Sequence, residues 1–421
     1  MARVNEEVPL SHDGLGMAPS LRVHKYGGPE AEEGGEEPDR KLCYIQGSLH
    51  ADELPGILVN HHLIKLLDAA AAQGRVLQRI HVVPYANPFG LYQTVLGDNQ
   101  GRFNIQTGTN FNRGFQDTTA ALLAADREPP LASLLQSAGA GAGADAVTSA
   151  AAHNAAVVRR EVRRELQLAA ESPTCSTEQF HKLQLLQRAS QADLVLDLHC
   201  DSAAQLHLYT HQDLWDYNGS GNSSSMRLLA AELQASPVLT SSGVGSECCF
   251  DDVCSNVFYQ VHSSAIGAAA GCPVAMACES CTVELRGSTD VTDELAHKDA
   301  AAIFRCLQRK GYVSPPADAA EAVSLVPAPA VPALLREATP LAAVDFVKAT
   351  AGGVATWKVQ VGDWVTVGQL LGEISVVQVC APSLFSSLFF SSLLFSLLFP
   401  TCFLFLKSNM PCCRREVCPQ C

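Results

Sequence analysis

Two residues spaced three apart, His50 and Glu53, are the first whose types and spacing point to chemistry. They follow an apolar run at 42–45 and precede a helical pattern of apolar residues. An imidazole and a carboxylate aimed at one point suit a zinc ion. The same pair also fits a plain helix N-terminus, where Asp52 and Glu53 would interact favourably with the helix dipole. The spacing therefore needs a third ligand before it indicates a metal site.

His199 is the candidate for that third ligand. It lies at the polar end of an apolar run at 193–201, and strand alternation places Asp197, His199 and Asp201 on one face. One zinc ion per chain, held by His50, Glu53 and His199, would keep a fourth position open, as catalytic zinc sites do. Zinc in such a site lowers the pKa of bound water to about 7 and polarises a carbonyl group.

Hydrolysis at such a site also needs a carboxylate that moves a proton and cations that hold the substrate. Glu284, at the end of a predicted strand, is the first choice for the catalytic carboxylate, and Glu279 is the second. Asn112 and Arg113 offer an amide beside a planar cation, which suits a substrate carboxylate. Arg102 is placed to face a developing oxyanion. A structural ion pair is the alternative for Arg113.

The elements that must position these residues alternate between strands and helices. Strands are predicted at 42–45, 80–85, 193–201 and 273–278, the last running on towards residue 284, and a helix is predicted over 290–310. Such alternation is typical of a mainly parallel sheet that is covered on both faces.

Composition along the chain predicts five segments. These are a mobile N-terminal arm at 1–40, a zinc hydrolase domain at 41–312, a Pro/Ala-rich linker at 313–340, a small all-β module at 341–378, and a Phe/Leu/Ser-rich and Cys-rich tail at 379–421. An Ala/Gly-rich insertion at about 118–172 interrupts the hydrolase domain. Its charged run at 159–165 is expected to be a solvated helix face.

The uncharged run 384–406 is long enough to span a bilayer, with Lys407, Arg414 and Arg415 behind it. A C-terminal membrane anchor is one interpretation. The run consists almost wholly of Phe, Leu, Ser and Pro, which are encoded by all-pyrimidine codons. We therefore favour a gene-model artefact, and a membrane is a partner only if this tail is genuine.

Charge and cysteine usage exclude other classes. A net charge of −14 over 421 residues argues against a nucleic-acid partner, because phosphate binding needs clustered cations. The first 30 residues lack the apolar region of a signal peptide. Sixteen cysteines, six of them in the tail, are then expected to be mostly free thiols in a reducing compartment, which favours a cytoplasmic location.

The run His50-Ala51-Asp52-Glu53 resembles the His-Gly-Asp-Glu metal motif of the succinylglutamate desuccinylase/aspartoacylase family, a branch of the zinc carboxypeptidase clan. Further matches follow in the same order over about residues 40 to 310: Asn87-Pro88, 101–103 with 110–113, 197–199 and 282–284. The resemblance implies an α/β fold with a mixed central sheet flanked by helices, zinc carboxypeptidase-like. It also implies a zinc-dependent deacylase that cleaves the amide bond of a small N-acyl amino acid, with Glu284 as catalytic carboxylate. Classification of the family's enzymes as hydrolases of ester bonds is the alternative.

The small C-terminal module resembles the barrel-sandwich domain that several family members carry. It has no Met-Lys-Met carrier site. We expect the module to be truncated, because the Phe/Leu/Ser-rich tail stands where its second half is needed. Three departures from the family motifs are visible: Ala51 replaces a glycine, Asn110 stands where many relatives have Asp, and Arg286 lengthens a Glu-x-Gly motif. Two other functions stay open, a metallocarboxypeptidase acting on peptides and a non-catalytic binding protein on the same scaffold. The oligomeric state is not predicted.

Overall fold

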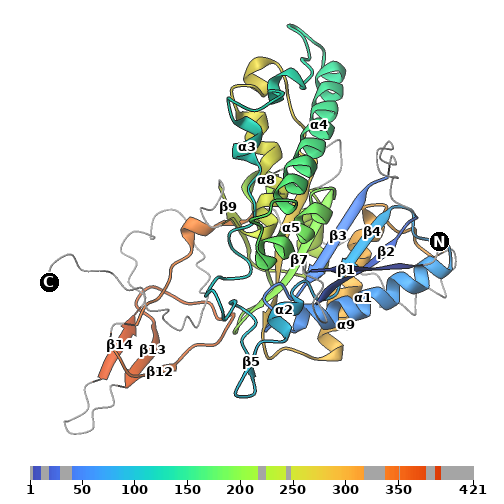
Figure 1. The fold of residues 1–421 in the computed structure, drawn as a ribbon. Coiled ribbons are helices and arrows are strands. Elements are labelled where there is room, and N and C mark those ends of the chain that lie inside the picture. The colour runs from blue at the N-terminus through green and yellow to red at the C-terminus, as the bar shows by residue number, and fades with distance from the viewer. Residues whose placement is uncertain are drawn as a thin grey trace.

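The structure, a computed structural model, describes residues 3–10, 19–28, 40–216, 224–242, 248–316, 337–349 and 351–375, and the backbone of 385–389. A nine-stranded mixed sheet forms its centre, and helices cover both faces of that sheet (Figure 1). This architecture confirms the predicted fold class, a mixed α/β fold with a central sheet flanked by helices.

The strand order in the sheet is β1-β2-β4-β3-β7-β10-β8-β9-β11. The four central strands β4, β3, β7 and β10 run parallel, and so do β8, β9 and β11; the β10–β8, β2–β4 and β1–β2 pairs are antiparallel. The bounds are β1 Val4–Pro9, β2 Ser20–Tyr26, β3 Leu42–Gly47, β4 Arg79–Val83, β7 Leu194–Asp201, β8 His207–His211, β9 Val238–Ser241, β10 Glu279–Gly287 and β11 Thr339–Pro340. The carboxyl ends of the parallel strands β3, β7 and β10 therefore lie next to one another, and the loops that follow them can bring side chains together there.

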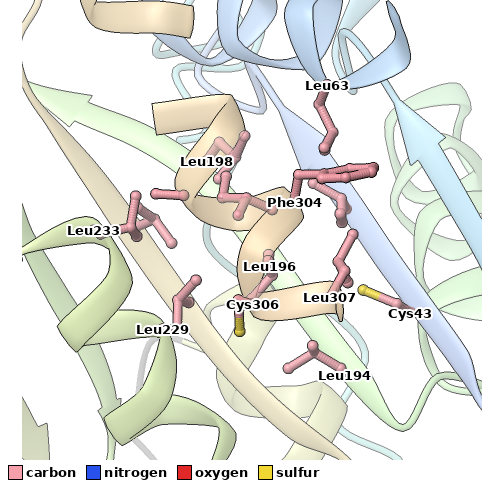
Figure 2. Close-up of a cluster of buried hydrophobic side chains, with 14 of the residues drawn as sticks. Cys43, Leu63, Leu194, Leu196, Leu198, Leu229, Leu233, Phe304, Cys306 and Leu307 are labelled. Atoms are coloured by element: carbon pink, nitrogen blue, oxygen red, sulfur yellow. The ribbon is translucent and has the colours of Figure 1, made fainter. Parts of the chain in front are cut away.

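Helices α1 (Pro55–Ala72), α7 (Ser225–Leu233) and α9 (Asp293–Arg309) cover one face of the sheet. Figure 2 shows this core, in which Leu194, Leu196 and Leu198 of β7 face Phe304 and Leu307 of α9. Helices α4 (Ala144–Ala170), α5 (Thr177–Ala189) and α8 (Phe250–Ser263) cover the other face, where Tyr44 and Val195 are buried. Strand alternation thus divides β3 and β7 between two cores.

Short elements connect these layers. They are α2 (Pro88–Leu91), the hairpin strands β5 (Thr94–Val95) and β6 (Asp98–Asn99), α3 (Thr119–Leu123), α6 (Gln212–Asp216), and 3-10 turns at Leu131–Ser133, Ala268–Ala270 and Leu341–Ala343. After the main sheet, β12 (Val354–Trp357), β13 (Leu370–Ser375) and β14 (Phe385–Phe389) form a separate three-stranded antiparallel sheet. Val359, Val365 and Leu371 make its small core. The β12–β13 pair shows β structure in this segment, but residues 358–369 between the two strands are turns and irregular chain, so the predicted short strands at 359–367 are absent.

The predictions of a mobile arm at 1–40 and of a strand at 273–278 are wrong. Within the predicted mobile arm at 1–40, residues Val4–Pro9 form the edge strand β1 and Ser20–Tyr26 form β2 beside it, because alternate residues of β2 such as Leu21 and Val23 are buried against the sheet. The run 273–278 is not a strand: β10 begins at Glu279, after Val274 and Cys278 have packed into the core beside α8.

The Ala/Gly-rich insertion contains the longest helix described, α4. Its charged run is only partly solvated, which corrects the expectation of a solvated face. Glu161 is buried and accepts a hydrogen bond from Arg127 at 2.6 Å, and Arg159 donates to the Ala277 carbonyl oxygen. The insertion thereby closes the core that α5 and α8 share.

None of the helices in the described ranges is long and apolar enough to cross a membrane. The tail at 379–421, on which the anchor and artefact interpretations rest, lies outside the described residues except for the β14 backbone. The ten cysteines that the structure describes are all free thiols, as expected.

Candidate metal centre

The loop between β3 and α1 carries His50 and Glu53 at the carboxyl end of the central strands. Ser48 turns the chain out of β3 with a φ of 58°, in the left-handed region that most residues avoid. A turn hydrogen bond from the Glu53 amide to the His50 carbonyl oxygen, 3.1 Å, then brings both side chains to one side. Gly56 lets α1 approach β7 closely, since a Cβ there would lie 2.9 Å from the Leu198 carbonyl oxygen.

Three hydrogen bonds hold this loop in place. The Asn87 amide donates to the Leu49 carbonyl oxygen at 3.0 Å, and the Ala86 backbone donates to Gly47 at 2.8 Å. From the other side, the Ala51 amide donates to the Gly101 carbonyl oxygen at 3.0 Å. The Asn87-Pro88 and 101–103 motifs therefore fix this loop, which we call the metal loop because it carries two possible metal ligands, His50 and Glu53. Ala51, where the family has glycine, is not among the residues with positive φ, so it is tolerated.

His50, Glu53 and His199 come together at this point, each buried, with possible ligand atoms within 4.8 Å of one another. The His50 Nδ1 atom lies 2.9 Å from Glu53 Oε1, and the His199 Nδ1 atom lies 2.8 Å from Glu53 Oε2. It is the only such group in the part of the chain that the structure describes. The two ligand candidates predicted from the 50–53 spacing therefore lie beside the one predicted from the end of the strand at 193–201.

The outer nitrogen of each imidazole has its own acceptor, which fixes the tautomer. Asn110 Oδ1 accepts from the Asn112 backbone at 2.8 Å and lies 2.8 Å from His50 Nε2, so Nε2 carries the proton. Asp197 Oδ2 lies 2.9 Å from His199 Nε2 and likewise accepts its proton. Both Nδ1 atoms therefore lie on the side of Glu53, where each is free to bind a metal ion once its imidazole is neutral. This is the arrangement of metal-ligating histidines with their outer partners.

The electrostatics fit a cation. Burial acts against charge on Glu53, but His199 and His50 outweigh it and hold the pKa of Glu53 well below its usual value. Burial lowers the pKa of His50. For His199 burial also opposes charge, yet Asp197 and Glu53 raise its pKa above the ordinary value. The raised pKa favours an additional proton on His199, and a bound metal ion would take the place of that proton. Two nitrogens and a carboxylate are a donor set that suits zinc.

Arg102 and Asn112 contact the ligand set directly. Arg102 Nη1 donates to Glu53 Oε1 at 2.8 Å and to His50 Nδ1 at 3.3 Å, with its side chain 37% exposed. Asn112 is buried; its Nδ2 lies 3.4 Å from His199 Nε2, and its Oδ1 accepts from the Phe250 amide at 2.9 Å. Asn112 therefore ties the metal site to the first turn of α8.

Arg113 lies one residue further out and is half-buried. Its Nη1 donates to the Asn112 carbonyl oxygen at 2.7 Å. Burial raises the pKa of Asp252, and the charges of His211 and Arg113 only partly oppose this. The Lys182 ammonium donates to the Arg113 carbonyl oxygen at 3.0 Å. Two cationic side chains, on Arg113 and Lys182, therefore lie beside the buried Asn112.

Glu284 lies next to His199 in the sheet. The two residues are register partners in the parallel β7–β10 pair, so their side chains share one face at adjacent positions. The register shifts between Glu284 and Gly287, and Arg286, with a φ of 64°, occupies this bulge and pairs with the buried Asp299 of α9. The extra residue in the motif is thus absorbed after Glu284 and leaves its position opposite His199 intact.

Glu279, the second choice for the catalytic carboxylate, is at the opposite end of β10. It pairs in register with Leu194, and its carboxylate accepts from the Ser225 amide at 2.7 Å and the Ser225 hydroxyl at 2.6 Å. Glu284 lies five positions further along the strand, about 16 Å away. Glu279 caps α7 and does not reach the metal site.

The sequence does not predict the supporting roles of two residues, Asn110 and Asp197. From the sequence, Asn110 is only a departure from the family motif, and Asp197 is only a neighbour of His199 on the strand face. The i, i+2 spacing of Asp197 and His199 carries the signal for the second, because both side chains then lie on one face. No local signal connects Asn110 with His50, since that contact depends on how a long loop folds back.

Comparison with known proteins supports this description. Residues 39–148 match the family model of the succinylglutamate desuccinylase/aspartoacylase catalytic domain. A search of curated protein sequences gave no match.

Solved structures show the same fold. A protein of Shewanella frigidimarina, described as a succinylglutamate desuccinylase/aspartoacylase, aligns with a TM-score of 0.67 and 20% identity over 92% of this chain and 90% of its own. A family protein of Shewanella amazonensis aligns at 0.64 and 20% over 91% of each chain, and one of Rhodobacter sphaeroides at 0.55 and 14% over 92% and 87%. The resemblance predicted from the sequence is therefore confirmed: residues 39–148 match the catalytic domain of the succinylglutamate desuccinylase/aspartoacylase family of hydrolases, and the chain has the fold of proteins described under that name.

Proposed function

We propose that this protein is a zinc-dependent hydrolase that cleaves the amide bond of a small N-acyl amino acid. The observation that carries the proposal is the convergence of the two Nδ1 atoms and the Glu53 carboxylate at the end of the central strands, beside Glu284. His50, Glu53 and His199 would hold one zinc ion. When bound, that ion would act as a Lewis acid and lower the pKa of water.

The chain's own residues supply the remaining chemistry. Glu284 would take a proton from the attacking water at its carboxylate and return it to the nitrogen of the departing amino acid. Its register position opposite His199 supports this role. Arg102, a partly exposed cation in contact with Glu53, would stabilise negative charge on the acyl oxygen.

We assign substrate binding to the polar loop that contains Asn112 and Arg113. A guanidinium group can hold a carboxylate by two parallel hydrogen bonds, and the half-buried Arg113 lies in this loop. Asn112 is buried against His199 and the α8 amide, so we assign it to shaping the binding surface beside Arg113. An N-acyl amino acid, which carries a carboxylate next to its amide, fits this arrangement.

A panel of N-acetyl, N-succinyl and N-formyl amino acids tests the proposal. We expect hydrolysis of at least one class, lost on chelation and restored by zinc. Glu284→Gln should keep zinc and lose about 10²- to 10⁴-fold in rate, the range for a general acid–base residue. Glu279→Gln, on the same strand but bonded to α7, is the matched control and should retain activity. Turnover of peptides alone, or equal activity of the Glu284 variant, would contradict the proposal.

A further inference from the structure

A row of hydrogen-bonded side chains extends from His199 into the core, away from solvent. The Tyr44 hydroxyl donates to Gln46 Oε1 at 2.9 Å, and Gln46 Nε2 donates to Asp197 Oδ1 at 3.0 Å. The other oxygen of Asp197, Oδ2, accepts from His199 Nε2 at 2.9 Å. The side chains of Tyr44, Gln46 and Asp197 are completely buried. We call these three residues and His199 the buried relay.

The sheet itself brings the relay together. Tyr44 and Gln46 are two residues apart on β3, and Asp197 and His199 are two apart on β7, so each pair lies on one face of its strand. The parallel β3–β7 register aligns Gln46 with Asp197. This face is covered by α8, and the Tyr44 ring lies 6.1 Å from the ring of Phe250. No loop takes part, so the backbone of two central strands sets the spacing.

In the relay, the donor or acceptor role of each side chain determines the role of its neighbour. The Asp197 carboxylate accepts at both oxygens, from Gln46 and from His199, so Gln46 presents its amide nitrogen to Asp197 and its oxygen to Tyr44. Burial raises the pKa of Tyr44 well above the usual value, so its hydroxyl keeps the proton that it donates. Without the Tyr44 hydroxyl, no group of the relay would donate to the buried Gln46 Oε1 atom. A flip of the Gln46 side-chain amide would then place Oε1 against the Asp197 carboxylate.

We propose that Tyr44 and Gln46 are positioning residues for the metal site: they fix the Asp197 carboxylate, which holds the His199 ring with Nδ1 towards Glu53. The inference rests on the metal site of the proposed function, and it does not depend on the substrate. Leaving a buried polar group unsatisfied costs about 1–3 kcal/mol, which is enough to disturb a ligand's orientation. The relay thus extends control of the metal ligand two residues beyond its direct partner.

Metal affinity and the absorption spectrum of the cobalt(II)-loaded protein test the proposal without any substrate. Gln46→Met removes both hydrogen bonds at similar volume, and Tyr44→Phe removes one hydroxyl. We expect Gln46→Met to weaken zinc binding 10- to 100-fold, as loss of outer-shell partners does, and Tyr44→Phe to weaken it less. Both should shift the cobalt spectrum, because the His199 ring changes orientation.

Tyr26→Phe is the matched control. Tyr26 is an equally buried tyrosine whose hydroxyl donates to Asp68 at 2.9 Å, remote from the metal loop. It should lower stability as Tyr44→Phe does, with unchanged zinc affinity and cobalt spectrum. A purely structural role for Tyr44 would make these two variants alike.

A double variant separates a relay from two independent effects. If Tyr44 acts through Gln46, Tyr44→Phe adds little further loss of zinc affinity in the Gln46→Met background. Full additivity, or wild-type affinity and spectrum in both single variants, overturns the proposal. Weakened zinc binding in a protein that hydrolyses no N-acyl amino acid would support the relay and contradict the proposed substrate class. Normal hydrolysis with unaltered zinc affinity in the variants would do the reverse.

Discussion

Lowering the pH should destabilise the fold through His181, a residue of α5 that supports the metal loop. His181 is completely buried, and its Nε2 donates to the Ala86 carbonyl oxygen at 2.6 Å. The next groups along the chain hold the loop: the Ala86 amide donates to Gly47, and Asn87 donates to Leu49. A proton on His181 would therefore introduce an unsolvated charge directly beneath the loop that carries His50.

The magnitude follows from the pKa of His181. Burial lowers this pKa from 6.5 to about 4. Between these values the unfolded chain binds a proton that the folded chain does not, so stability is fully present above pH 6.5 and is lost as the pH falls towards 4. At about 1.4 kcal/mol per pKa unit, the difference corresponds to about 3 kcal/mol.

Urea unfolding of the metal-free protein between pH 7.5 and 4 measures this loss. His181→Gln is the matched variant, because a glutamine nitrogen can still donate to Ala86 but does not titrate in this range. We expect the wild type to lose about 3 kcal/mol more than the variant over the window. Identical pH dependence in the two proteins would refute the reasoning.

Two further predictions concern the contacts that fix the metal loop. Gly101→Ala should destabilise the protein by about 1–3 kcal/mol and weaken zinc binding, because a Cβ there would lie 2.4 Å from the Asp52 amide nitrogen. Gly143→Ala, where nothing lies within 4 Å, is its control, and equal melting temperatures for the two variants would contradict the steric argument. Asn87→Ala removes the bonds to Leu49 and Gly90 and should cost about 1–3 kcal/mol by thermal unfolding; an unchanged melting temperature would show that these bonds do not support the loop.

The sequence predicts the ligands of the metal site because their signals are local. His50 and Glu53 are three residues apart in one loop, and His199 ends an apolar strand, so each position follows from chain geometry alone. The central strands β3, β4 and β7 are predicted for the same reason: their apolar runs are short, continuous and bounded by polar residues.

The wrong predictions arise where tertiary contacts override local pattern. The strands β1 and β2 are polar on one face, and the acidic residues Glu6 and Glu7 of β1 conceal their alternation. The apolar run 273–278 reads as a strand, yet it packs beneath α8 without joining the sheet. The hydrogen bonds from Asn110 to His50 and from Gln46 to Asp197 join segments far apart in sequence, which no spacing rule reveals.

Zinc content is the most direct test of the central claim that His50, Glu53 and His199 form one metal site. Elemental analysis of the purified chain, after exposure to zinc and dialysis, should give about one zinc per chain, since a site with three protein ligands holds a single ion. His199→Ala should reduce this content to near zero while the fold, measured by circular dichroism, persists. Well under one zinc in the wild type, or an undiminished content in the variant, would contradict the account.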